Sequence, residues 1–417
     1  MKRILIISPG PFSPTDNDGQ TLEDMFQQWD KSKLAQFFIQ DIGADFEFCD
    51  KYFRVNDSGA LKYLLNKSYD PIPTRQYRKD KVNTIGGKSV PKNSLTLLLR
   101  NQLWKISPWK RSGVLEWIIN YSPEVIFFEV GDNTYMIDFV IRLKKLLSIP
   151  LVVHNTEGFY FFKEPYFKHP SFAERFLYSH FHKKFVKSYS RLMQNTDYVF
   201  YSCEKLQKEF AEIYSVPSSV VYKTATFAKD RKTTKKEVSK ISYVGNLSFN
   251  RPAALIEIAD FLKESYSDLV IDVYGKIQSS DEEKAFKTHS NISYHGFIEY
   301  SAVEDVIASS DILLHVESKL SEREVAYGFS TKIPLSLASG ACFFMYAPET
   351  VAGQDYIRTH IPLASAISNG EMRNKLGDIL SDYEFRRQIT LEELELAKKN
   401  HNKNTILTNF SNIISVL

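Results

Sequence analysis

The sequence has few cysteines and no long apolar run. Cys49, Cys203 and Cys342 are far apart and odd in number, which argues against a disulfide framework and favours a reducing compartment. None of the three has a neighbour at metal-ligand spacing, so we expect no metal site. No apolar stretch is long enough to span a bilayer, and the short run after Met1 reaches Pro9 too soon for a signal peptide. We therefore expect a cytoplasmic protein.

The sequence also lacks a clear excess of positive or negative side chains. The 53 Lys and Arg residues nearly balance the 50 Asp and Glu residues, so the net charge of +3 gives no general case for nucleic-acid binding. The length of 417 residues is enough for two or three domains with their own cores. Aromatic residues are in excess, and many of the 30 Phe and 23 Tyr stand beside Lys or Arg.

The glycine fingerprint of dinucleotide-binding domains is absent too. Residues 2–8 predict a buried strand, and residues 21–29 predict the helix that follows it. This order is the usual start of a Rossmann-like domain. Gly10 is not followed by the two further spaced glycines, which argues against a nicotinamide enzyme.

Polar residues follow two further strands predicted in the N-terminal half. They are Glu129 and Asp132 around the end of the strand at 124–130, and His154 and Glu157 around the end of the strand at 149–154. In doubly wound sheets, ligands bind beyond the carboxyl ends of the strands. Each residue can also be read as a capped turn residue, but their joint occurrence favours a function for at least one of them.

Two stretches combine basic and aromatic side chains. Residues 71–111 hold ten basic side chains against one acid, with Trp104 and Trp109 among them. Residues 159–193 predict a helix in which Phe and Tyr alternate with Lys and His. Each stretch can be a core segment with a solvated basic edge, or a surface that binds an anionic membrane. We expect peripheral association with the inner face of the cell membrane through one or both stretches.

The C-terminal half repeats the strand–helix alternation. The charged run at 229–240 predicts an interdomain linker. After it come strands at 241–244, 269–274, 292–295 and 312–316, with helices at 253–265, 281–289 and 303–308 between them. This regular alternation favours a parallel sheet. The sequence therefore predicts an α/β protein with two Rossmann-like halves.

The stretch YGFSTKIPLSLASG at 327–340 stands out in this half. It predicts a turn, a helix at 331–339 capped by Ser330, and a left-handed end at Gly340. The apolar run that follows predicts a buried strand. A glycine turn that leads into a helix N-terminus favours anion binding, although an ordinary loop-to-helix junction has the same pattern.

Several motifs of this half resemble those of retaining glycosyltransferases of the GT-B fold, family 4. The segments are ISYVGNLSFNR, DVYGK, NISYHGFIEYSAVEDVIASSDILLHVES and KIPLSLASG, in the family's order and spacing. The resemblance implies two Rossmann-like doubly wound domains facing a central cleft. It implies an acceptor-binding domain at 1–228, a linker at 229–240, a nucleotide-sugar-binding domain at 241–398, and a C-terminal helix at 399–417 that packs back on the first domain.

The resemblance also implies the residues of the site. The donor-binding residues would be Gly245, Asn246, Arg251, Gly328, Phe329, Ser330, Thr331 and Lys332. The catalytic residues would be His154, Arg251 and Lys332, and the acceptor-binding residues Asp18, Gly19, Glu129, Asp132 and Glu157.

The sequence departs from the family pattern in three places. Asn246 stands at the first position of the family's basic pair, so one positive charge is missing. The family's two glutamates correspond to Tyr327 and Leu335, and both are lost. Lys332, one turn before Leu335, could supply charge instead, and one of Glu317, Glu322 and Glu324 could compensate for the lost glutamates.

The activity implied by the resemblance is sugar transfer from a UDP- or GDP-sugar to a glycan or lipid-linked glycan acceptor in surface polysaccharide synthesis. The enzyme would be a retaining, hexosyltransferase-like enzyme that needs no metal or other cofactor. The loss of both glutamates keeps an alternative open. In that alternative the chain is a non-catalytic GT-B module that binds acceptor and supports a partner glycosyltransferase.

Overall fold

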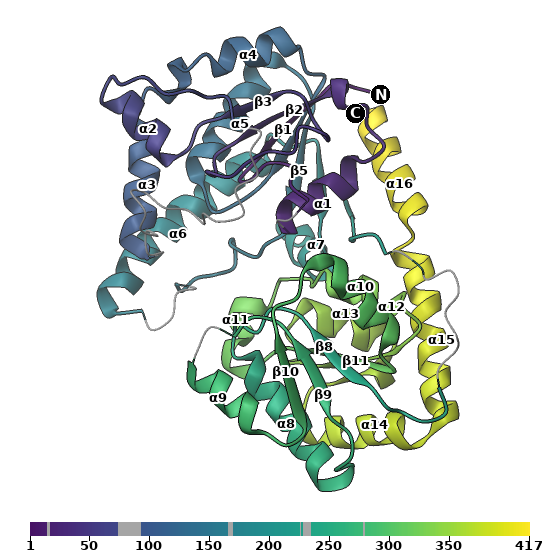
Figure 1. Ribbon diagram of the computed structural model, residues 1–417. Coiled ribbons are helices and arrows are strands. Elements are labelled where there is room, and N and C mark those ends of the chain that lie inside the picture. The colour runs from purple at the N-terminus through teal and green to yellow at the C-terminus, as the bar shows by residue number, and fades with distance from the viewer. Residues whose placement is uncertain (15–16, 74–92, 166–169, 226, 228–234, 278–279) are drawn as a thin grey trace. The chain divides into compact units, whose positions relative to one another are not determined.

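The chain forms two compact units, each built around one parallel sheet. The computed structural model describes residues 1–14, 17–73, 93–165, 170–225, 227, 235–277 and 280–417. Unit 1 comprises Met1–Ser202, Leu206–Val221 and Leu407–Leu417, and unit 2 comprises Cys203–Lys205 and Tyr222–Ile406. Figure 1 shows the elements of both units.

Unit 1 is organised around a seven-stranded sheet in the order β3-β2-β1-β4-β5-β6-β7, with every neighbouring pair parallel. Its strands are β1 (Ile4–Ser8), β2 (Leu34–Phe38), β3 (Tyr52–Arg54), β4 (Val125–Glu129), β5 (Leu151–Asn155), β6 (Tyr198–Tyr201) and β7 (Ser218–Val220). The helices of this part of the chain are α1 (Asn17–Phe26), η1 (Lys31–Lys33), α2 (Asp57–Leu64), α3 (Ser94–Ile106), η2 (Trp109–Arg111), α4 (Val114–Tyr121), α5 (Thr134–Leu147), α6 (Phe172–Met193) and α7 (Glu204–Ala211).

Both faces of this sheet are covered. Every residue of β1, β2, β4 and β5 is buried, which explains why the sequence shows continuous apolar runs instead of alternation. On one face, the ring of Phe26 from α1 packs edge-on against Phe127 of β4. On the other face, Phe37 of β2 stacks on Trp109 and contacts Phe139 of α5.

Unit 2 is organised around a six-stranded sheet in the order β10-β9-β8-β11-β12-β13, again with parallel pairs. Its strands are β8 (Ile241–Val244), β9 (Ile271–Tyr274), β10 (Ile292–Gly296), β11 (Ile312–Val316), β12 (Cys342–Tyr346) and β13 (Ser365–Ala366). Its helices are α8 (Arg251–Ser265), α9 (Ser280–Thr288), α10 (Tyr300–Ser309), η3 (Lys319–Ser321), α11 (Glu322–Val325), α12 (Lys332–Leu337), α13 (Ala352–His360), η4 (Pro362–Ala364), α14 (Asn369–Ser381) and α15 (Tyr383–Asn400). The predicted α/β class with two Rossmann-like parallel sheets is confirmed.

The last helix, α16 (Lys403–Val416), contributes to the core of unit 1. The ring of Phe410 lies 5.2 Å from Phe26, 5.8 Å from Trp29 and 5.0 Å from Phe200, measured between ring centroids. Ile414, one turn further along, is fully buried in the same cluster. The core of unit 1 is therefore made from two parts of the chain that are separated by unit 2.

The end of the predicted linker is fixed on unit 2. Residues 229–234 of that run lie outside the described part of the chain. Beyond them, the buried Arg386 of α15 donates from Nη2 to the carbonyls of Lys235 and Lys236, at 2.8 Å each. Asp311 accepts hydrogen bonds from the backbone N–H groups of Ser239 and Lys240. These contacts hold the start of β8 in place.

Candidate functional site

Three glycines bring the carboxyl ends of β8, β9 and β10 close together. The Gly245 N–H donates to the Tyr274 carbonyl at 3.0 Å, and the Gly275 N–H donates to the Gly296 carbonyl at 2.8 Å. A Cβ atom on Gly275 would lie 2.0 Å from the Gly245 carbonyl oxygen, which no real side chain tolerates. The turn after β8 therefore packs on the chain after β9 only because residue 275 is glycine.

The turn after β8 is held by hydrogen bonds to one carbonyl. The Asn246 carbonyl accepts from the Tyr243 hydroxyl at 2.9 Å and from Nη1 of Arg251 at 3.1 Å. The Asn246 side chain accepts from the Ser248 N–H. Asn250, just before α8, has a left-handed backbone with φ of 54°. The predicted donor-binding turn is thus a fixed part of the structure, built mainly by its own neighbours.

Arg251 is paired with a buried carboxylate. Its Nε and Nη2 atoms each lie 2.8 Å from an oxygen of Glu317, which follows β11. His315 Nε2 lies 3.5 Å from the same carboxylate. Burial opposes ionisation of Glu317, but the contact with His315 and the charge of Arg251 outweigh it and lower the pKa of the carboxyl. The predicted donor-site cation therefore has its charge balanced within unit 2.

The segment at 327–340 differs from the prediction in the bounds of its helix and in the contact made by Gly328. The helix α12 spans Lys332–Leu337, whereas residues 331–339 were expected. Ser330 Oγ accepts from the Lys332 N–H at 3.3 Å, and Gly340 has the expected left-handed backbone with φ of 76°. The Gly328 N–H, expected to face an anion, donates to the Val325 carbonyl. Because α12 is only six residues long, its dipole is small and side-chain charge matters more here.

The structure shows the contacts of Tyr327 and Leu335, which stand at the family's two glutamate positions. It also shows the contacts of the three carboxylates that could replace those glutamates. Lys205 lies over the ring of Tyr327, 5.6 Å from its centroid, and Leu335 is half-buried. Glu317 pairs with Arg251 as described, Glu322 accepts from the Thr350 hydroxyl, and Glu324 lies 3.5 Å from Arg323. All three substitute carboxylates are therefore engaged by neighbouring side chains.

His154 is covered in unit 1. Only 1% of the residue is exposed, and its Nδ1 lies 4.0 Å from Oε1 of the buried Glu129. No described residue makes a hydrogen bond to Nδ1. Burial lowers the pKa of His154 to about 4, so the imidazole is neutral at neutral pH.

The other predicted acceptor residues are spread over two helix starts and a loop. Asp18 is exposed in the first turn of α1, Asp132 is half-buried before α5, and Glu157 is exposed after β5. A Cβ on Gly19 would lie 2.7 Å from the Pro11 carbonyl, so this glycine serves close packing of α1. Glu129, Asp132, His154 and Glu157 lie around the ends of β4 and β5 as predicted, but sequence reasoning did not separate the buried ones from the exposed ones.

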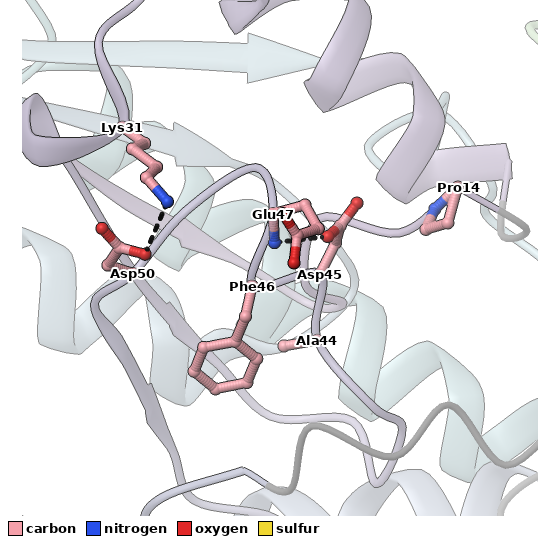
Figure 2. A pocket seen from close by; sticks show the side chains of 7 residues that line it. All are labelled: Pro14, Lys31, Ala44, Asp45, Phe46, Glu47 and Asp50. Atoms are coloured by element: carbon pink, nitrogen blue, oxygen red, sulfur yellow. Dashed lines mark hydrogen bonds and ion pairs between the residues drawn. The ribbon is translucent and has the colours of Figure 1, made fainter.

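A pocket of about 460 Å³ opens elsewhere on unit 1 (Figure 2). It is lined by Pro14, Lys31, Ala44, Asp45, Phe46, Glu47 and Asp50. Lys31 forms an ion pair with Asp50 at 3.2 Å, and the Glu47 N–H donates to Asp45 at 2.8 Å. The pocket shares no residue with the predicted acceptor site.

Sequence reasoning missed three residues that the structure brings into view. His315 supports Glu317, Lys223 carries a charge that acts on Lys332, and Glu23 lies beside Asp45. Lys223 and Glu23 belong to no motif, and His315 lies within the segment DILLHVES, whose pattern does not single it out. Among the described residues, no three His, Cys, Asp or Glu side chains gather as metal ligands would.

Comparison with known proteins adds a result about fold. No family model matches the sequence, and no curated protein sequence is similar enough to count as a match. Solved structures do match over the whole chain. HepE from Anabaena, in complex with UDP, matches with a TM-score of 0.66 at 12% identity and covers 100% of both chains.

The chain has the GT-B glycosyltransferase fold. Sucrose-phosphate synthase from Thermosynechococcus elongatus matches with a TM-score of 0.65 at 11% identity, over 100% of this chain and 98% of that one. The lipopolysaccharide outer core galactosyltransferase WaaB matches with a TM-score of 0.61 at 13% identity, over 99% of each chain. In this GT-B chain, the glycine turn after β8 and the segment that leads into α12 both belong to the C-terminal Rossmann-like unit.

Proposed function

We propose that this GT-B chain transfers a sugar from a uridine diphosphate sugar to a glycan or lipid-linked glycan acceptor in surface polysaccharide synthesis. The observation that carries the proposal is the full-length match to HepE, which was solved with UDP, with UDP and glucose, and with UDP-glucose. The match to WaaB, a lipopolysaccharide outer core galactosyltransferase, supports the acceptor class.

Within unit 2, we assign the donor's phosphates to Lys332 and to the backbone at 329–331. Lys332 opens α12, is half-buried, and makes no side-chain ion pair with any described residue. The Arg251–Glu317 pair is electrically balanced, so we assign it the task of fixing the turn at Gly245 and Asn246. Lys332 is then the side chain that offers uncompensated positive charge to the leaving group.

Within unit 1, the exposed carboxylates are the better acceptor ligands. Asp18 and Glu157 are exposed and Asp132 is half-buried, whereas Glu129 and His154 are covered. We assign hydroxyl recognition to the first three residues. Glu129 and His154 then stabilise the ends of β4 and β5, since these two residues are partners in the register of the two strands.

We further propose transfer with retention at the anomeric carbon and without a metal ion. The bond from that carbon to the β-phosphate oxygen breaks, and the acceptor oxygen bonds to the same carbon. The proton of the acceptor hydroxyl passes to the leaving phosphate, so no enzyme base of matched pKa is needed. The neutral, buried His154 fits this scheme as a positioning residue. Activity that disappears with EDTA and returns with Mg²⁺ would contradict metal independence.

The first experiment is a thermal-shift measurement with UDP, followed by turnover of UDP-sugars read by mass spectrometry. A ligand present at 100 times its Kd stabilises the native state by about 2.7 kcal/mol, so UDP should raise the melting temperature by several degrees. GDP is the control for base selectivity. A chain whose melting temperature responds to neither nucleotide would contradict the proposal.

The second candidate is a GT-B module that binds acceptor without catalysis. The observation that favours it is the replacement of both family glutamates by Tyr327 and Leu335. Binding of UDP without hydrolysis or transfer of any UDP-sugar would support this module. Release of UDP from one UDP-sugar above the rate of a heat-treated sample would exclude it.

We also propose that unit 1 binds an anionic membrane surface, but through only some of the residues in the two predicted stretches. Trp104 and Trp109 are each 1% exposed, and Tyr178, Phe181 and Phe185 of α6 are buried as well, so all five belong to the core. Six of the ten basic residues at 71–111, namely Arg75, Arg78, Lys79, Lys81, Lys88 and Lys92, lie outside the described residues. No described helix has the length and apolar content needed to cross a bilayer.

The exposed apolar side chains lie on neighbouring helices. Phe172 is 87% exposed and Phe176 is 71% exposed, one turn apart at the start of α6. On α3, which packs against α6, the residues Leu95, Leu99 and Ile106 are exposed at helical spacing. Figure 1 shows α2, α3 and α6 beside one another in unit 1. The exposed Lys183, Lys184 and Lys187 continue along α6 and provide the charge that anionic lipids attract.

Flotation with phosphatidylglycerol vesicles tests this surface. The Phe172→Ser/Phe176→Ser variant should lose most of the vesicle binding of the parent. Ile119→Ser removes a similarly exposed apolar side chain from α4 and should bind like the parent. Equal binding to neutral phosphatidylcholine vesicles would show that charge plays no part.

A further inference from the structure

A short segment after β7 is fixed to the end of α15. The Lys223 carbonyl accepts from Nδ1 of His401 at 3.2 Å, and the Ala225 N–H donates to the His401 carbonyl at 2.9 Å. His401 is fully buried, and its Nε2 lies 3.0 Å from the Tyr356 hydroxyl, which donates to it. Burial lowers the pKa of His401 to about 4, so the ring is neutral and has one donor and one acceptor, as these contacts require.

The same ring cluster holds the segment that leads into α12. The ring of Tyr222 lies 5.2 Å from Phe329, 5.3 Å from Tyr356 and 5.0 Å from His401, measured between centroids. Phe329 also contacts Tyr356 edge-on at 5.3 Å. Residues 222 and 329 are thus packed on one another, and each is close in sequence to a lysine. The four rings keep the backbone of Lys223 beside the segment that ends at Lys332.

The charge of Lys223 acts on the ammonium group of Lys332. Burial, and then the charge of Lys223, lower the pKa of the Lys332 ammonium. Within the described residues, no carboxylate forms an ion pair with Lys332. Two ammonium groups carried on segments that pack together through Tyr222 and Phe329 repel each other, and an anion bound between them changes that repulsion into attraction.

We propose that Lys223 and Lys332 together form an anion site that binds the phosphate groups of the nucleotide. The identity of this anion rests on the proposed function, whereas the site itself rests on the ring cluster and the two side chains. Lys223 then supplies the second positive charge that Asn246 does not provide in the turn after β8. Lys223 precedes the motifs that resemble the family, all of which begin after residue 240.

Titration calorimetry with two probes, inorganic pyrophosphate and UDP, tests the site. Lys223→Ala and Lys332→Ala should each weaken binding of both probes roughly 10-fold, the loss typical of a charge-assisted contact. Lys263→Ala removes an exposed lysine from α8 and should change neither affinity. Without an anion, Lys332→Ala should melt no lower than the parent, because it removes a half-buried charge that pairs with no carboxylate among the described residues. A purely structural lysine would show the opposite behaviour.

The outcomes separate this inference from the proposed function. If the parent binds UDP and both site variants bind both probes unchanged, or only one variant is affected, the lysine pair is overturned and the proposed function stands. If the variants lose pyrophosphate but the parent binds UDP no better than pyrophosphate, the anion site stands and the proposed function fails. If the parent binds neither probe, both are overturned.

Discussion

Because Glu317 is buried, a substitution of Arg251 changes the stability of unit 2 as well as any contact with a ligand. Arg251→Ala would leave a carboxylate that is 5% exposed without the guanidinium that holds it. Breaking a buried pair from one side costs about 3 kcal/mol or more, whereas replacing both partners by apolar side chains costs little. We expect Arg251→Ala to lower the free energy of unfolding of unit 2 by that amount, and Arg251→Met/Glu317→Leu to recover most of it.

Urea unfolding followed by far-UV circular dichroism measures this difference. If Arg251→Ala unfolds at the parent's urea midpoint, the pair adds nothing to stability and Arg251 is free for a ligand. Any loss of sugar transfer in Arg251→Ala should therefore be compared with Glu317→Gln, which disturbs the same turn but keeps the arginine.

Glu23 on α1 should give unit 1 a pH dependence of its own. Burial, and then the neighbouring Asp45, raise the pKa of this carboxyl from 4.5 to about 8. Between these two values the folded state binds more protons than the unfolded state, so stability falls as pH rises from 4.5 to 8. Because Glu23 is only partly buried, we expect a loss on the order of 1 kcal/mol.

The measurement compares urea unfolding at pH 5 and pH 8. Glu23→Gln should remove most of the decrease, so that the variant is the more stable protein at pH 8. Glu116→Gln changes an exposed glutamate of α4 and should follow the parent at both pH values. A Glu23→Gln protein with the parent's full pH dependence would contradict the prediction.

At the scale of elements, the strands were predictable because burial on both faces leaves an unbroken apolar run. β8 and β11 have the predicted bounds, β4 is shorter than predicted by one residue at each end, and β12 begins one residue after the start of the predicted apolar run. Helix ends were harder. α6 begins at Phe172, whereas the predicted helix began at residue 159. A capping box of Ser171 and Glu174 marks this start, and it can be read directly from the sequence. α12 stops early because the backbone carbonyl of Ser336 accepts from Ser339 Oγ.

The site was less predictable because its contacts join distant parts of the chain. Nothing near Arg251 in sequence announces Glu317, and nothing near Lys332 announces Lys223. Helical spacing shows that one face of α3 differs from the other, but it does not show which face is buried. Trp104 therefore looked like a membrane contact, whereas its ring stacks on Tyr135 in the core, 4.4 Å between centroids. The strand-end position of His154 likewise does not reveal that the ring is covered.

The glycine contacts between β8 and β9 give a prediction for this sheet. Gly275→Ala places a methyl group 2.0 Å from the Gly245 carbonyl and must push the two strand ends apart. We expect unit 2 to lose about 2–4 kcal/mol, the range of severe steric changes, and UDP binding to weaken with it. Gly370→Ala, in the first turn of α14, meets no atom within 4 Å and should be neutral or slightly stabilising.

Thermal unfolding with and without UDP checks both variants. The informative comparison is within unit 2, because residues 275 and 370 both belong to it. If Gly275→Ala has the parent's melting temperature, the turn after β8 relaxes without cost. The donor site would then not depend on the position of that turn.

At the scale of the whole molecule, the core of unit 1 depends on α16. Phe410 is 1% exposed and packs on Phe26, Trp29 and Phe200. Phe410→Ala should cost unit 1 about 3–5 kcal/mol, through lost transfer energy and the cavity left behind. All four tryptophans, Trp29, Trp104, Trp109 and Trp117, lie in unit 1, so tryptophan fluorescence follows this unit alone.

Urea unfolding followed by that fluorescence should show a lower midpoint for Phe410→Ala. Asn412→Ala on the exposed side of α16 should keep the parent's midpoint. If fluorescence reports the same midpoint for Phe410→Ala and the parent, α16 is not part of the cooperative unit that the contacts describe.

This arrangement has a consequence for synthesis on the ribosome. Residues 1–202 emerge first, but the segment that completes their core, Leu407–Leu417, is translated only after all of unit 2. Until then the apolar surface around Phe26 and Phe127 lacks the side chains that cover it, while unit 2 already has its whole sheet. Unit 2 is therefore the first unit that can finish folding, although it is synthesised second. Unit 1 is the one that a chaperone would bind in the meantime.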